Sequence, residues 1–247
     1  MDFAIVSLTK IMYDICTPPG SSEAGREAAP RRPLLLSRAS MDTIVYIDGF
    51  NLYYRALKGT PYKWLNLLRM CEALLPHSNI VAVKYYTAKV SSRPNDPDQP
   101  VRQQVLLRAL STIPNLEIIY GRFLPSIVSM PLAHPSPHGP RFAQVMKTEE
   151  KGSDVNLATH MVHDGHLNRY ETAVIISSDS DLAEPLRIVR HELGKQVGIL
   201  NPSKHPSREL NQYATFVKTI RKGVLQSCQF PHTLQDSAGV FRKPAGW

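Results

Sequence analysis

Short apolar runs rich in Val, Ile and Tyr alternate along the chain with longer segments whose apolar residues recur every three or four positions. The short runs predict buried strands, because β-branched and aromatic residues between turn residues favour extended backbone. The longer segments predict helices with one face against a core. Strands are predicted over 43–47, 80–87, 116–120, 172–177, 196–200 and 215–220, and helices over 65–75, 101–110, 153–162 and 180–193.

The predicted helix ends carry recognisable signals. Ser153 or Asp154 can cap one helix, Ser180 and Asp181 begin another, and Gly194 ends it. Strictly alternating strands and helices predict an α/β fold with a mainly parallel, doubly wound sheet and helices on both faces.

Three regions depart from this alternation. Residues 1–40 lack periodicity and contain linker-like proline clusters, so we expect an irregular extension and hypothesise a native start at Met41. One domain is predicted over 41–225, followed by an irregular tail over 226–247. Residues 123–142 predict a hairpin insertion with a long tip, which either selects substrate or is merely tolerated length.

Carboxylates follow the predicted strands at two places and precede a predicted helix at a third. Asp48 ends the first run, Asp179 and Asp181 follow the fourth, and Asp154 begins the helix after Glu150. Parallel strands deliver such residues to one edge of the sheet, where ligands bind in open α/β folds. Like charges held close together raise one another's pKa, and a divalent cation relieves that repulsion. The pattern predicts a metal site.

Composition narrows the function further. The formal net charge of +8 and the pI near 9.4 fit a polyanionic partner such as nucleic acid. Three cysteines without zinc-ligand spacing indicate neither a disulfide framework nor a zinc site. No apolar run approaches the roughly 20 residues that span a bilayer. We therefore expect a cytoplasmic protein with no membrane partner, and homo-oligomerisation is left open.

Three sequence blocks carry a family resemblance: DGFNL at 48–52, EKGSDV at 150–155 and SSDSDL at 177–182. In order and spacing they resemble the signature blocks of the NYN domain family, the PIN-like ribonucleases that include LabA-like bacterial proteins. The resemblance covers about residues 41–222 and implies a Rossmann-like, PIN-like fold. It also implies Mg²⁺- or Mn²⁺-dependent cleavage of RNA, expected to be endonucleolytic with 5′-phosphate and 3′-hydroxyl products.

The resemblance assigns roles to individual residues. It implies that Asp48, Asp154 and Asp179 are catalytic metal ligands, with Asp181 as the next contributor and Asn51 as the polar partner of the first acid. Ser178 and Leu182 depart from the family pattern, where glycine and an aromatic residue are common. Ser178 therefore bears on how closely a phosphate approaches. Basic residues expected at the same sheet edge either bind phosphates or balance the acids: Lys151, Lys204 and Arg208.

Two other functions compete with the ribonuclease. A non-catalytic module that binds RNA or protein in the same crevice has little need for so many acids. A metal phosphatase would need a second acid in the loop after the first strand, and the sequence Asp48-Gly49-Phe50 lacks it. The acids also have a purely structural interpretation as helix caps, which their joint convergence would argue against.

Overall fold

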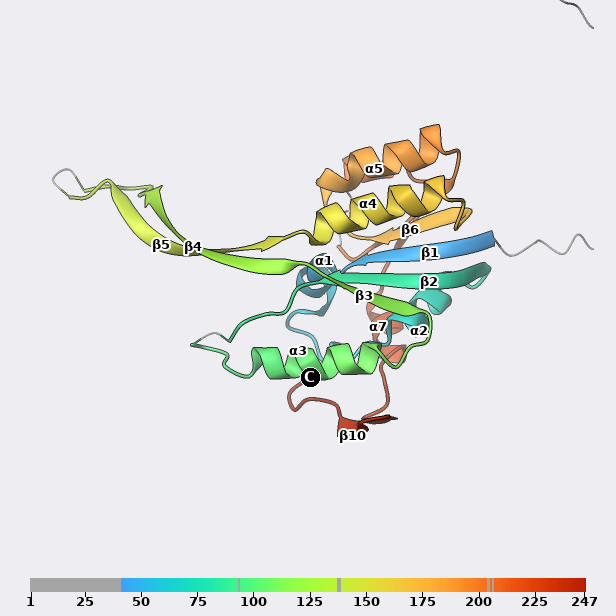
Figure 1. Cartoon of the computed structure of the whole chain (residues 1–247), viewed down its shortest axis with the longest axis horizontal. Helices are drawn as coiled ribbons and strands as arrows, with labels where there is room; N and C mark the ends of the chain where they lie inside the picture. The colour runs from blue at the N-terminus through green and yellow to red at the C-terminus, as the bar shows by residue number, and fades with distance from the viewer. Residues whose placement is uncertain (1–40, 93, 137–138, 204, 206) are drawn as a thin grey trace, which may run out of the picture. The chain divides into compact units, whose positions relative to one another are not determined.

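The structure is a computed structural model that describes residues 41–247 apart from 93, 137–138, 204 and 206. The expectations for residues 1–40 lie outside the described residues. The described chain forms a central sheet flanked by helices, with a two-stranded hairpin extending from it (Figure 1).

Six strands form the central sheet, and every neighbouring pair is parallel. Their order is β3-β2-β1-β6-β7-β8, so the chain builds outward from β1 in one direction and then from β6 in the other. The predicted doubly wound parallel sheet is confirmed, and the reversal between β1 and β6 creates the crevice where such folds bind ligands. The strands are β1 (Met41–Asp48), β2 (Ser78–Thr87), β3 (Leu116–Tyr120), β6 (Thr172–Ile176), β7 (Gln196–Asn201) and β8 (Phe216–Thr219).

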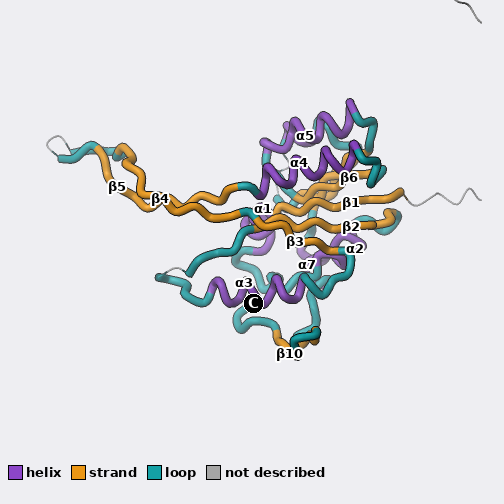
Figure 2. Tube along the Cα trace, in the orientation of Figure 1, coloured by secondary structure: helices purple, strands orange, loops and turns teal. Residues whose placement is uncertain are grey.

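Helices cover both faces of the sheet, as Figure 2 shows. On one side lie α4 (Ser153–His166), α5 (Ala183–Arg187) and the π-helical turn η3 (Ile188–Glu192). On the other side lie α2 (Leu67–Leu74), α3 (Gln99–Leu110) and α7 (Lys222–Ser227). Shorter elements complete the set: α1 (Gly49–Leu52), η1 (Tyr53–Leu57), η2 (Ser180–Leu182) and α6 (Arg208–Asn211).

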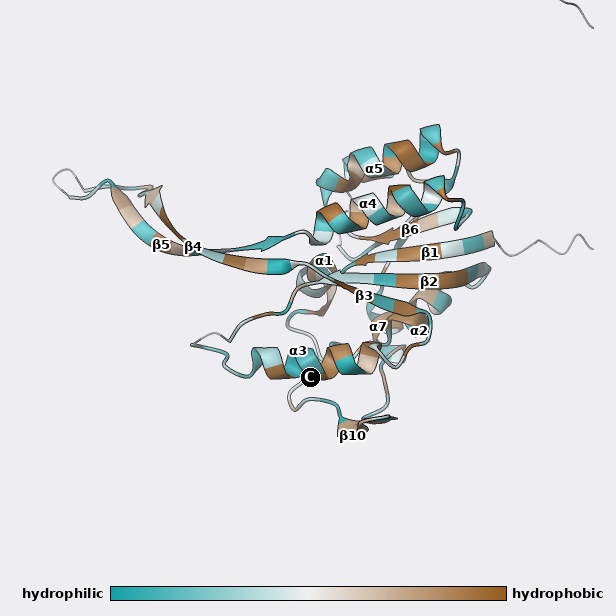
Figure 3. Cartoon of the chain, in the orientation of Figure 1, coloured by the Kyte–Doolittle hydropathy of each residue, from teal (hydrophilic) through white to brown (hydrophobic). Residues whose placement is uncertain are grey.

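Alternation along the central strands creates two separate cores. Ile44 and Tyr46 pack on the α4 side, whereas Val45 and Ile47 pack on the α2 and α3 side. Successive side chains of a strand point to opposite faces, so a central strand with both faces buried needs apolar residues at odd and even positions alike. This need explains why β1 reads as a continuous apolar run. Figure 3 shows the complementary pattern on α4 and α5, whose surfaces carry both apolar and polar stretches.

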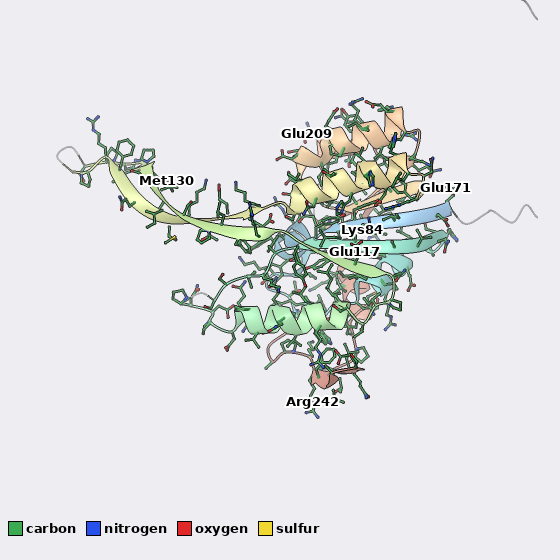
Figure 4. All side chains as sticks on the ribbon, in the orientation of Figure 1. Lys84, Glu117, Met130, Glu171, Glu209 and Arg242 are labelled. Atoms are coloured by element: carbon green, nitrogen blue, oxygen red, sulfur yellow. The ribbon has the colours of Figure 1, made fainter. Side chains whose placement is uncertain are left out.

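The hairpin is longer than the predicted 123–142 segment. Strands β4 (Arg122–Pro131) and β5 (Phe142–Lys151) pair antiparallel along their full length, and Met130 lies far out on this arm (Figure 4). Strand β5 runs directly into α4 through Gly152, whose φ of 101° places it in the left-handed region that favours glycine. Gly152 is therefore the N-cap of α4, in place of the predicted Ser153 or Asp154 cap.

Two further segments differ from expectation. The single helix predicted over 180–193 is divided into η2, α5 and η3. Asp179 caps η2 by accepting a hydrogen bond from the Asp181 backbone N–H. Residues 226–247, expected to be irregular, complete α7 and form the hairpin of β9 (Thr233–Asp236) and β10 (Gly239–Arg242). No helix in the described part of the chain is long and apolar enough to cross a membrane.

Candidate functional site

The first acid stands where β1 ends, beside the point at which the strand order reverses. Asp48 is 5% exposed, and both of its carboxylate oxygens accept hydrogen bonds. The Asn51 backbone N–H donates to Oδ1 at 2.9 Å, and the Ser177 hydroxyl donates to Oδ2 at 3.0 Å. Ser177 Oγ in turn accepts from the Asp179 backbone N–H at 3.1 Å. One buried hydroxyl thus links Asp48 to the segment that carries Asp179.

A second link joins the same two strand ends. The Asn51 side-chain oxygen accepts hydrogen bonds from Ser178, at 3.2 Å from its backbone N–H and 3.0 Å from its hydroxyl. Asn51 therefore connects the start of α1 to the loop after β6. The amide oxygen is engaged by Ser178, so its observed role is to hold the two loops in register.

Asp154 completes the group from a third part of the chain, the first turn of α4. Its pKa is raised to about 6, first by burial and then by the negative charges of Asp48, Asp179, Glu150 and Asp181. Burial also raises the pKa of Asp48, with Asp179 adding to the effect against the hydrogen bonds from Asn51 and Ser177. Carboxylates from three distant segments thus repel one another in one place.

These acids open into a pocket of about 870 Å³. Asp48, Glu150, Asp154 and Asp179 line it, together with residues of α1, η1, α3 and the hairpin. Glu150 is further held by Ser153, which donates from its backbone N–H at 3.2 Å and from its hydroxyl at 2.6 Å. The pocket is therefore acidic where strands β1 and β6 end, as the sequence predicts for a cation site.

The donor chemistry of this pocket suits a hard cation. Among the described residues, no group of three or more His, Cys, Asp or Glu side chains is placed so that it could hold a metal ion. Mg²⁺ does not require one, because it keeps several waters and is usually held by one or two carboxylates together with substrate phosphates. Asp48, Asp154 and Asp179 supply carboxylate oxygens of the type that this mode of binding uses, and metal coordination by them stays a prediction.

The other candidates lie away from the centre. Asp181 is exposed and acts on Asp154 through its charge, but it does not line the pocket. Lys151 forms an ion pair with Glu149 at 3.1 Å, which favours the charge-balancing interpretation. Arg208 is exposed on α6 and also lies outside the pocket lining. Lys204 is among the residues that the structure does not describe.

One wall of the pocket was not predicted as part of the site. Phe50 and Phe123 meet edge to face with ring centroids 5.6 Å apart, joining α1 to the base of the hairpin. Basic and aromatic side chains from four elements or loops continue this wall: Tyr53, Tyr54, Arg55, Lys63, Arg102 and Trp247. Phe50 and Tyr53 could have been found from their position beside Asp48. Trp247 gives no local signal, because only folding brings it here.

Comparison with family models shows the family, and two individual proteins are similar to the chain. A family model described as NYN domain matches residues 42–220. The chain is 32% identical over 242 residues to 6-hydroxy-3-succinoylpyridine 3-monooxygenase HspA of Pseudomonas putida (strain DSM 28022 / S16), covering 86% of this chain and 77% of that protein. Among solved structures, it resembles VPA0982 of Vibrio parahaemolyticus RIMD 2210633, a protein of unknown function, with 15% identity and a TM-score of 0.48. That similarity covers 75% of this chain and 96% of the other.

Proposed function

The chain belongs to the NYN domain family, and from that premise we propose that it is a metal-dependent ribonuclease that hydrolyses RNA phosphodiester bonds. The observation that carries the proposal is the convergence of Asp48, Asp154 and Asp179 on one pocket at the reversal of strand order. An acid group of this kind, with Asp48 buried and Asp154 and Asp179 partly buried, is unfavourable for stability, since burial and the neighbouring charges raise the pKa values of Asp48 and Asp154.

The three aspartates would hold Mg²⁺ or Mn²⁺, with Asp181 contributing negative charge nearby. When bound, such an ion lowers the pKa of a coordinated water and neutralises charge on the phosphate. The protein residues keep the acids in place: Ser177 holds Asp48, and Asn51 fastens the loop that carries Asp179. Fixing the ligands before substrate arrives reduces the reorganisation that the reaction needs.

The substrate side of the proposal follows from charge. Arg55 and Lys63 line the same pocket as the acids, so a phosphodiester backbone meets positive charge beside the cation site. The net charge of +8 favours attraction of RNA to the protein. We expect internal cleavage that leaves 5′-phosphate and 3′-hydroxyl ends, the products of metal-assisted water attack on phosphorus.

The direct test is cleavage of end-labelled single-stranded and structured RNA with Mg²⁺ or Mn²⁺, followed by analysis of the product ends. Asp48→Asn and Asp179→Asn should each reduce cleavage at least roughly 100-fold while thermal unfolding stays cooperative. Asp42→Asn is the matched control, because Asp42 is exposed at the opposite end of β1. RNA binding without cleavage under all metal conditions would instead favour a non-catalytic binding module.

The similarity to HspA favours a second candidate, oxygenation of an aromatic nitrogen heterocycle. That relative is named for 6-hydroxy-3-succinoylpyridine and a monooxygenase reaction. The pocket described here has aromatic walls that suit a planar ring, including Phe50 and Phe123. Oxygen consumption with 6-hydroxy-3-succinoylpyridine and a reductant such as NADH measures this activity directly. Substrate-dependent oxygen uptake with no RNA cleavage would replace the ribonuclease proposal.

A further inference from the structure

The segment that follows the family-matched region reaches back into the pocket. The family match ends at residue 220, yet Ala245, Gly246 and Trp247 line the same pocket as Asp48 and Asp154. In Figure 1 the end marked C lies beside α3, which supplies Gln99, Arg102, Gln103 and Leu106 to that lining. The aromatic and basic part of the pocket lining is thus partly built by residues outside the family-matched region.

This segment is fastened to the domain at two places. Near its start, Trp64 donates from Nε1 to the Pro231 carbonyl at 2.8 Å, and the Phe230 backbone N–H donates to the Trp64 carbonyl at 2.9 Å. Further along, Arg108 of α3 donates to both carboxylate oxygens of Asp236 at 2.7 and 2.6 Å. The Arg108 guanidinium also lies 4.2 Å from the Phe241 ring centroid. These contacts hold the β9–β10 hairpin in place, and Trp247 lies five residues after its last strand.

Trp247 itself combines contact with the core and access to the pocket. Its side chain is partly buried and packs against the core on the α2 and α3 side. Lys63 Nζ lies 5.9 Å from the Trp247 ring centroid, within the range of a cation–π contact. An indole ring that packs against a core and also lines a pocket is a surface on which another planar ring can stack.

The charges around Trp247 indicate which planar ring it suits. Arg102 is held by Asp96 at 2.5 and 2.6 Å, whereas Arg55 and Lys63 add positive charge to the pocket wall. A ligand that carries an aromatic ring beside a phosphodiester would satisfy the indole and the cations together, and its phosphate would also complement a cation held by the acids. Nucleobases stack on such platforms with little sequence preference, because every base has a π-face.

We propose that Trp247, with Lys63 Nζ 5.9 Å from its ring centroid, is the stacking platform for one base of a single-stranded RNA substrate bound in this pocket. The inference rests on the ribonuclease proposal for its substrate class. Trp247 binds and positions the strand, and it takes no part in proton transfer or hydrolysis. The segment after residue 220 therefore supplies a substrate subsite from outside the region that the family model matches.

Tryptophan fluorescence provides a readout that does not depend on cleavage. The chain has two tryptophans, and Trp64 is fully buried in the core. In Asp48→Asn protein, titration with a short single-stranded oligoribonucleotide should quench the fluorescence saturably, and Trp247→Phe in that background should remove the quenching. Trp247→Ala should raise the Kd about tenfold or more, the loss typical for one stacked base, whereas Trp247→Phe keeps a ring and most of the affinity.

Kinetics on the wild-type background give the second readout. Trp247→Ala should raise KM with little change in kcat, because it removes binding without touching the acids. Val240→Ala is the control, since Val240 is 62% exposed on β10 in the same segment, and it should leave both constants unchanged.

The outcomes separate this inference from the proposed function. Unchanged Kd and KM in Trp247→Ala, with RNA cleavage intact, would overturn the stacking platform and leave the ribonuclease standing. Quenching by the oligoribonucleotide in a protein that cleaves no RNA under any metal condition would support the subsite and overturn the ribonuclease. Quenching by 6-hydroxy-3-succinoylpyridine but by no nucleotide or oligoribonucleotide would overturn the proposal of an RNA base at this position.

Discussion

At the scale of single residues, the raised pKa of Asp154 shows that bringing the acids together is energetically unfavourable. Its ordinary pKa of 3.8 rises to about 6 in the folded protein. Between those values Asp154 binds more protons in the folded chain than in the unfolded chain, so the contribution of Asp154 to stability is greatest below about pH 4 and is lost as the pH rises to about 6. The metal-free protein is therefore destabilised at neutral pH by the group that would bind the cation.

We predict that Asp154→Asn stabilises the metal-free protein at pH 8 by roughly 1–2 kcal/mol, after allowance for the partial exposure of the side chain. At pH 4 the effect should nearly vanish. Mg²⁺ should raise the Tm of the wild type at pH 8 and leave that of the variant almost unchanged. Thermal unfolding with EDTA or Mg²⁺ at both pH values measures each effect, and an identical Mg²⁺ response in the two proteins would contradict the assignment.

A second buried acid, Asp164 on α4, has the opposite character. Its carboxylate is 1% exposed and accepts from Lys84 Nζ at 2.6 Å, Tyr46 Oη at 2.8 Å and Arg169 at 2.9 Å. Burial alone raises the pKa of Asp164, but these donors outweigh burial and hold the pKa below its ordinary value. The network therefore stabilises the fold above about pH 4, and this stability is lost as the pH falls further.

We predict that Asp164→Asn lowers the free energy of unfolding by roughly 3 kcal/mol at pH 7, because it leaves the Lys84 ammonium without its charged partner. Lys84→Met in the same background should recover part of this loss. Denaturant unfolding of the single and double variants gives the coupling energy. Asp42→Asn, with its exposed carboxylate, should change stability by less than about 0.5 kcal/mol. Equal losses of unfolding free energy in Asp42→Asn and Asp164→Asn would show that the buried network stabilises the protein no more than an exposed carboxylate does.

At the scale of elements, the turn from β1 into α1 needs a glycine for space. A Cβ on Gly49 would lie 2.6 Å from the Tyr86 carbonyl oxygen and 2.7 Å from Cζ of Tyr85, closer than real contacts allow. The backbone of α1 therefore passes directly against β2 immediately after Asp48. This close approach fixes the direction in which Asn51 and Phe50 leave the strand.

We predict that Gly49→Ala destabilises the protein by about 2–3 kcal/mol, since overpacking displaces backbone that cannot yield. Displacement of α1 should also lower RNA cleavage by disturbing Asp48 and Asn51. Gly223→Ala is the control, because a Cβ there meets no atom within 4 Å in helix α7, and it should be neutral or stabilising by about 0.5–1 kcal/mol. Chemical denaturation and cleavage rates check both, and wild-type behaviour of Gly49→Ala would contradict the packing argument.

The same scale explains how much the sequence could predict. The central strands lie within two residues of their predicted bounds, because strands buried on both faces appear as continuous apolar runs. The β9–β10 hairpin could not be predicted, because its strands have four residues each and their sequences show no clear alternation of apolar and polar residues. The acids could be placed because parallel strands share an edge. The positions of Ser177 beside Asp48 and of Trp247 in the pocket lining could not be predicted, since they depend on contacts across more than a hundred residues.

At the scale of the whole molecule, one ion pair joins the segment after residue 220 to the domain. The Arg108 guanidinium lowers the pKa of Asp236 to about 2, so the pair stays charged throughout the usual working range. Arg108 also donates to the Gly239 carbonyl at 3.0 Å, which fastens the turn of the β9–β10 hairpin to α3.

We predict that Arg108→Gln speeds amide hydrogen exchange across β9 and β10 while β1 and β6 keep their protection, because only the outer segment loses its attachment. Arg187→Gln is the matched control, since Arg187 pairs with Glu184 and Glu192 on an exposed surface of the opposite layer. Exchange measured by mass spectrometry distinguishes the two. Equal exchange rates at β9–β10 in both variants would show that Arg108 does not hold the hairpin.

The pairing of β1 with β6 has a consequence for how the chain folds. Ser177 and Asp48 are 129 residues apart in sequence, yet the hydroxyl of one binds the carboxylate of the other. Contacts between such distant positions form slowly, because the chain loses the entropy of closing a long loop before these contacts stabilise the fold. An isolated N-terminal or C-terminal half of the chain would lack the acidic centre altogether. The rate at which cleavage activity returns during refolding would therefore report how fast β6 pairs with β1.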